Sequence, residues 1–192
     1  MGTVASHIRY ESKERERSET KSPEFAPMSY LWALRFVIGF QFLSAFIRRY
    51  INAPAKMNPA SPAFLGHKFS TFYPHAIWPV KPILSVIIQH PNTTFGFLTF
   101  FSIVELLVGL FLITGTLTKL AGFGGAMLSL MILLGSGWMG TSCVDEWQIG
   151  TVEGIAAMVF MFAGSGKFGV DHWIRRHWDG KLKLGKFHIS LL

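Results

Sequence analysis

The chain has 192 residues, of which half are hydrophobic and only 15% are charged, with a formal net charge of +7. Soluble proteins are on average about a quarter charged, and residues 25–104 contain no Asp or Glu at all, so the composition argues against an ordinary soluble domain. The basic residues border long apolar stretches and no nucleic-acid-binding motif is present, which argues against a nucleic-acid partner and favours a membrane protein.

Residues 1–27 are polar and hold five basic and five acidic residues. They offer no apolar cluster from which a core could form. We therefore interpret this segment as a mobile cytoplasmic tail that precedes the membrane domain.

Residues 28–170 are predicted to form an all-α membrane domain, a bundle of four transmembrane helices. A helix needs about 20 apolar residues to cross about 30 Å of hydrocarbon. The stretches that qualify are residues 28–47, 97–117, 121–140 and 149–166. The third stretch contains six glycines. Because small residues allow helices to approach closely in lipid, we expect this span in the middle of the bundle.

A long loop, residues 48–96, joins the first two spans and holds seven of the nine prolines. Residues 82–89 are apolar but too short to cross the bilayer. We expect them to form a short interfacial or re-entrant helix with Pro82 in its first turn.

The same loop carries basic residues and no acidic residue, so its cations have no carboxylate partner nearby in the sequence. A small oxyanion is well bound by converging Arg, Lys and His donors. The predicted anion-binding residues are Arg48, Arg49, Lys56, His67, Lys68 and His75. Two alternatives are contacts of these cations with lipid phosphates and binding of a partner protein's acidic surface.

Four residues with charged or amide side chains fall inside the predicted spans: Arg35, Gln41, Glu105 and Glu153. Ionisable groups are costly in hydrocarbon and are functional candidates there. At a rise of about 1.5 Å per residue, the last three lie in one layer of the outer half of the membrane, with Arg35 nearer the inner face. They predict a quinone site in which a buried carboxylate exchanges protons. The structural alternative is an ion pair between Arg35 and Glu105 that holds helices together.

The remaining motifs are weaker. The single cysteine, Cys143, excludes an internal disulfide and is either an inert thiol or a nucleophile toward a sulfur substrate. Residues 164–169 match the glycine pattern of dinucleotide-binding loops, but they follow a predicted span and not a strand. We expect no haem, flavin or metal site. Residues 171–192 are predicted to be a basic amphipathic tail. Lys and Arg are more numerous on the side of both termini, which places the termini in the cytoplasm and the long loop outside.

Four stretches resemble the DoxD-type subunit of archaeal thiosulfate:quinone oxidoreductase, within the wider DoxX-like group of four-helix membrane proteins. They begin at Leu34, Asn58, Glu105 and Gly164, and they read LRFVIGFQFLSAFIRR, NPASPAFLGHKF, ELLVGLFLITGTLTKL and GSGKFGVD. The resemblance implies a multi-pass subunit of the cell membrane that oxidises thiosulfate to tetrathionate and passes electrons to membrane quinone. It also implies a separate DoxA-type partner subunit.

Three hypotheses follow. In the first, the outer cations bind thiosulfate, and quinone binds non-covalently near Gln41, Glu105 and Glu153. In the second, the chain is a non-catalytic accessory or assembly subunit of a respiratory complex. In the third, it is an anion-conducting membrane protein.

Overall fold

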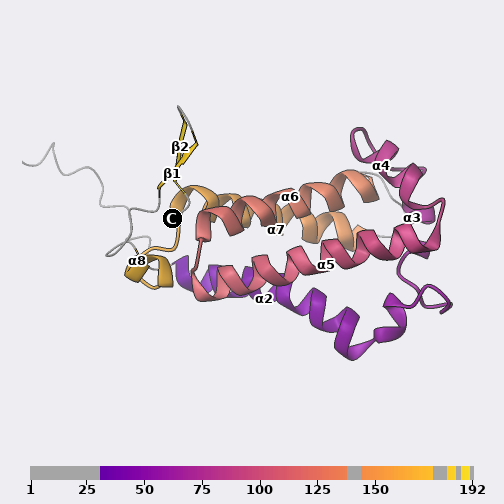
Figure 1. Cartoon of the computed structure of the whole chain (residues 1–192), viewed down its shortest axis with the longest axis horizontal. Helices are drawn as coiled ribbons and strands as arrows, with labels where there is room; N and C mark the ends of the chain where they lie inside the picture. Colours follow the sequence, from indigo (N-terminus) through magenta and orange to yellow (C-terminus); the bar gives the residue numbers. More distant parts are fainter. Residues whose placement is uncertain (1–30, 138–143, 175–180, 185–186, 191–192) are drawn as a thin grey trace, which may run out of the picture.

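The computed structural model describes residues 31–137, 144–174, 181–184 and 187–190. In this part of the chain, four long helices lie side by side along the long axis of the molecule (Figure 1). They are α2 (Trp32–Ile47), α5 (Pro91–Thr114), α6 (Thr118–Ser136) and α7 (Val144–Ala163). Helix α2 packs mainly on α5 and α6 mainly on α7, and further contacts between α5 and α6 and between α2 and α7 close the bundle.

The segment between α2 and α5 covers one end of the bundle, which we name the loop end (residues 48–90; right in Figure 1). It contains the π-helical η2 (Arg48–Asn52), the 3₁₀-helical η3 (Pro54–Met57), α3 (His67–Phe72) and α4 (Val80–Ile87). Helix α4 overlaps residues 82–89, where a short helix was expected, and has Pro82 in its first turn. Its buried face packs on α6, where Val80 and Leu84 lie beside Gly135.

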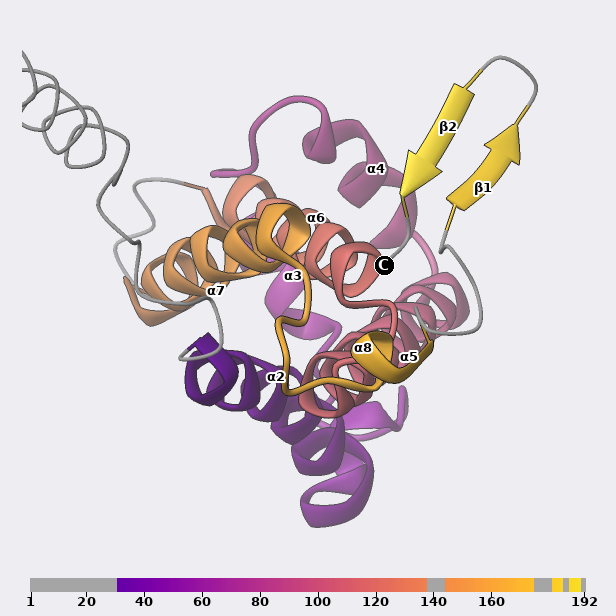
Figure 2. The same cartoon turned by 90° about the vertical axis from the view of Figure 1, so that its left-hand side faces the viewer.

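The opposite end, which we name the α8 end, contains the turn from α5 to α6, residues 164–169 and the short helix α8 (Val170–Ile174). Viewed from this end, α8 lies against the end of α5 (Figure 2). An antiparallel hairpin follows, formed by β1 (Lys181–Leu184) and β2 (Phe187–Ser190). The region predicted to be an amphipathic tail therefore contains a short helix and a hairpin that the sequence pattern did not indicate.

The observed helices differ from the predicted spans mainly at their ends. Helix α5 begins at Pro91 and not at residue 97, because proline is well suited to a first helical position even when polar residues follow. Helices α5 and α6 are long and apolar enough to cross a membrane, and residues 148–163 of α7 form a shorter apolar helix. Residues 1–30 and 138–143 lie outside the described part of the chain.

The core of the bundle takes residues from all four long helices. Its buried members are Ile38, Phe42, Val108, Leu112, Ala121, Leu128, Ala156 and Phe160. Glycines bring the helix backbones together around it. A Cβ atom added to Gly109 would lie 2.7 Å from the backbone nitrogen of Leu43, and one added to Gly122 would lie 2.5 Å from that of Met161. Glycine-mediated packing was expected for α6, but the close approach of α2 and α5 was not.

Candidate functional site

A cavity of about 500 Å³ lies at the loop end of the bundle. Its walls come from η2, η3, α3, α4, α5 and α6. The cationic lining residues are Arg48, Arg49, Lys56, His67 and Lys68. Five of the six predicted anion-binding residues therefore converge on one cavity, although they come from three separate elements of the loop. The lining residues include no Asp or Glu.

His75 is the predicted anion-binding residue that does not line this cavity. It is exposed and follows α3, and its backbone lies against Gly137 at the end of α6. The loop turns between His67 and His75, so the two histidines face different surroundings. Residue type alone could not separate them.

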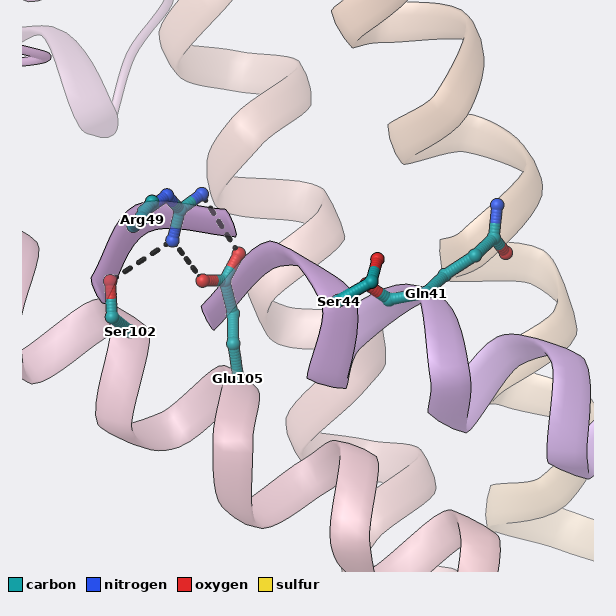
Figure 3. A network of polar contacts seen from close by, with 5 residues as sticks. All are labelled: Gln41, Ser44, Arg49, Ser102 and Glu105. Carbon is teal, nitrogen blue, oxygen red and sulfur yellow. Dashed lines mark hydrogen bonds and ion pairs between the residues drawn. The ribbon is translucent and has the colours of Figure 1, made fainter. Parts of the chain in front are cut away.

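Arg49 forms the central polar contact beside the cavity (Figure 3). Its Nη1 donates to Ser102 Oγ at 3.0 Å and to Glu105 Oε2, and its Nη2 donates to Glu105 Oε1 at 3.2 Å. Ser102 and Glu105 are three residues apart on α5, so they share one helix face. The exposed fraction is 0% for Ser102 and 2% for Glu105. A forked arginine–carboxylate pair of this kind fixes the guanidinium in one orientation.

This pair corrects two expectations. The loop cations were expected to lack a carboxylate partner, and that is wrong for Arg49, because Glu105 reaches it from inside α5. The alternative ion pair between Arg35 and Glu105 is also wrong, because Arg35 lies at the α8 end of α2.

At the α8 end, Arg35 joins α2 to the segment that follows α7. Its guanidinium donates to the backbone oxygen of Ser165 at 2.6 Å and to that of Phe168. Asp171 binds the start of α6 by accepting from the backbone N–H groups of Leu117 at 2.6 Å and Thr118 at 2.8 Å. These contacts show a structural role for Arg35, which the sequence had placed with the quinone site.

The close packing of the segments at the α8 end also depends on Gly115. Its φ of +70° lies in the left-handed region, which glycine adopts without strain. A Cβ atom here would lie 2.7 Å from the Cα of Gly169 and 2.9 Å from Cζ of Arg35. Gly169, the last glycine of the dinucleotide-like pattern, therefore packs closely against Gly115.

Replacing Asp171 by alanine is expected to lower the free energy of unfolding by about 3 kcal/mol. The change removes the acceptor of two charge-assisted hydrogen bonds from the first turn of α6, each worth about 1.5–3 kcal/mol. Denaturant titration in detergent micelles would measure this. The matched control is His172→Ala, which changes the exposed neighbouring residue and is expected to have little effect. Equal stabilities of the two variants would contradict the role assigned to Asp171.

The other polar residues of the predicted quinone layer do not join the cavity. Glu153 of α7 is buried, with 8% of its surface exposed. The side chain of Gln41 points away from the Arg49–Glu105 pair (Figure 3). Neither Gln41 nor Glu153 lines the cavity. Cys143 lies outside the described residues, and those residues contain no group of three or more potential metal ligands.

Sequence reasoning missed the apolar wall of the cavity. Phe69, Phe97 and Phe101 line it, with ring centroids 5.9 Å apart for the first pair and 6.0 Å apart for the second. The sequence signal was the spacing of Phe97 and Phe101, four residues apart on one helix face. In an apolar span, however, the sequence does not distinguish two phenylalanines that line a cavity from two that face lipid.

Fold and site together define a helical protein with a cavity at one end of its bundle that is lined by both basic and aromatic side chains. The chain matches the family described as "TQO small subunit DoxD" over residues 30–191, so it belongs to the DoxD family, as its sequence stretches indicated. This family and the two long apolar helices indicate a membrane protein, and the description as a small subunit implies a partner subunit. No solved structure matches the chain.

Proposed function

We propose that this chain is the subunit of thiosulfate:quinone oxidoreductase that binds thiosulfate, which is oxidised to tetrathionate with membrane quinone as the electron acceptor. The observation that carries the proposal is the convergence of Arg48, Arg49, Lys56, His67 and Lys68 on one cavity. The family description supports the same reaction.

The chemistry of the reaction requires such a cavity. Tetrathionate forms when two thiosulfate dianions join through their terminal sulfur atoms, so two like-charged ions must approach each other. Fixed cations offset this repulsion most effectively where water is excluded. Because Glu105 balances Arg49, Arg49 serves as a precisely oriented donor. The surplus positive charge of the lining then comes from Arg48 and Lys56.

The proposal also includes a location. All four long helices cross the cell membrane, the loop end faces outward, and both termini are cytoplasmic, as the distribution of Lys and Arg predicts. Thiosulfate then reaches the cavity from the outer aqueous side, and a separate DoxA-type subunit completes the enzyme.

Two matched pairs of variants test thiosulfate binding. In the purified complex, His67→Ala and Lys56→Met are each expected to raise the thiosulfate KM about tenfold, which corresponds to about 1.4 kcal/mol of lost binding. The controls are His75→Ala and Lys81→Met, whose residues do not line the cavity. They are expected to leave KM unchanged. The measurement is thiosulfate-dependent reduction of decyl-ubiquinone.

Three further outcomes separate this proposal from the other hypotheses. If the cavity variants keep a normal KM while Glu105→Gln dissociates the complex, the chain is an accessory subunit. If liposomes containing the chain take up thiosulfate without any quinone reduction, the chain conducts anions. Absence of thiosulfate-dependent reduction in the intact complex would refute the enzymatic proposal itself.

A further inference from the structure

We propose that the quinone head group binds in this same cavity, against Phe97 and Phe101, so that thiosulfate and quinone meet directly. This inference rests on the proposed function and differs from the quinone site that the sequence indicated. The size of the cavity is the first observation that supports a quinone here. A volume of about 500 Å³ lies within the range of about 300–1,000 Å³ that is typical for sites of larger organic ligands. Small oxyanions alone would leave much of this space unfilled.

The aromatic wall of the cavity suits a planar ring. The apolar lining residues include Phe69, Leu84, Phe97, Phe101, Met131 and Ile132, from helices α3, α4, α5 and α6. Phe97 packs edge to face on Phe69, with an angle of 71° between their rings. Aromatic faces and a methionine thioether favour flat, polarisable rings, whereas they offer nothing to a hydrated dianion. The basic and the aromatic lining residues therefore suit different classes of ligand.

One polar group beside this wall has no partner. The Nε–H group of Arg49 is buried and makes no hydrogen bond within the described part of the chain. Buried donors without a partner are rare in proteins. Arg49 lines the cavity and binds Ser102, the residue that follows Phe101. A quinone carbonyl is an acceptor that could satisfy this donor, and Glu105 would hold the guanidinium in place for it.

The predicted layer of Gln41 and Glu153 lacks these features. Neither residue lines the cavity, and the side chain of Gln41 is directed away from Arg49 and Glu105. A carboxylate beside a quinone carbonyl would also need to be protonated in order to donate. The cationic and aromatic cavity combines space, a flat apolar wall and a fixed donor.

Placing both substrates in one cavity gives a complete redox step. Each of two thiosulfate dianions loses one electron, and a sulfur–sulfur bond forms between their terminal sulfur atoms. The quinone accepts the two electrons, and its two carbonyl oxygens take up two protons from water to give the quinol. No bond within either thiosulfate breaks. The cations of the cavity stabilise the charge that moves toward the quinone oxygens.

Quinone binding can be measured without turnover. The purified complex would be titrated with decyl-ubiquinone in the absence of thiosulfate. Phe97→Ala is expected to raise the dissociation constant at least tenfold. The matched control is Phe100→Ala on the same helix, whose side chain is 67% exposed and does not line the cavity. That control and Gln41→Ala are expected to leave the constant unchanged.

Photolabelling of the unmodified complex provides a second readout that does not depend on the folding of any variant. An azido-substituted ubiquinone is expected to label residues 97–101 or 131–136. Labelling around residue 41 or in residues 148–157, or a weaker affinity for Gln41→Ala but not for Phe97→Ala, would overturn the inference.

The two proposals fail in different ways. If decyl-ubiquinone binding depends on Phe97 but thiosulfate drives no reduction, the shared cavity is supported and the enzymatic function is refuted. If thiosulfate drives reduction and the KM depends on His67, while quinone binding is unaffected by Phe97→Ala, the function stands and the shared cavity is refuted.

Discussion

Replacing Arg49 by alanine is expected to lower the free energy of unfolding by about 3–5 kcal/mol, because the change leaves the buried carboxylate of Glu105 without a counter-charge. It also orphans the hydroxyl of Ser102, to which Arg49 donates. Denaturant titration of the purified chain in detergent micelles measures this free energy of unfolding.

Two further variants identify the cause. The neighbouring Arg48→Ala is the matched control, because Arg48 is exposed, and it is expected to cost about 1 kcal/mol or less. The double variant Arg49→Ala/Glu105→Gln removes both charges and is expected to recover at least half of the loss. If the double variant is as unstable as Arg49→Ala, the ion pair is not the reason for the instability.

The second large effect is expected at the contact between α2 and α5. Gly109→Ala would place a Cβ atom 2.7 Å from the backbone nitrogen of Leu43 and 2.8 Å from the oxygen of Gly39. Backbone atoms cannot rotate aside, so the helices must separate, at a cost of about 1–3 kcal/mol. The free energy of unfolding in detergent is again the measured quantity.

A second glycine of helix α5, Gly96, provides the matched control for this experiment. Gly96 has no atom within 4 Å of an added Cβ, so Gly96→Ala gains helix propensity without a clash. It is expected to leave stability unchanged or to raise it by up to about 1 kcal/mol. Opposite signs for the two glycines support the close approach of α2 and α5, whereas equal effects would contradict it.

The sequence was most informative where the signal was local. Long apolar stretches indicated the four long helices, and the predicted and observed ends differ by up to six residues. Residues 82–89 indicated a short helix that the structure places at Val80–Ile87. The density of cations without acids in residues 48–96 indicated an anion site, and five of the six residues do line one cavity.

What the sequence could not supply was pairing between distant segments. Arg49 and Glu105 are 56 residues apart, and the sequence offered Arg35, inside a predicted span, as the partner of Glu105. Arg35 was assigned by its presence in a span, but its partners are backbone oxygens of residues 165 and 168, which carry no sequence signal. Phe97 and Phe101 were hidden because lipid and an apolar cavity select the same residues.

The contacts of Arg35 and Asp171 have a mechanical consequence. Together they tie α2, the α5–α6 turn and the segment after α7 to one another at the α8 end. At the loop end, the backbone N–H of Ile77 donates to the oxygen of Leu134 in α6, and Arg49 pairs with Glu105 of α5. The segments that line the cavity are therefore fixed to the helices at the end where the cavity lies, while Arg35 and Asp171 fix the helices to one another at the opposite end.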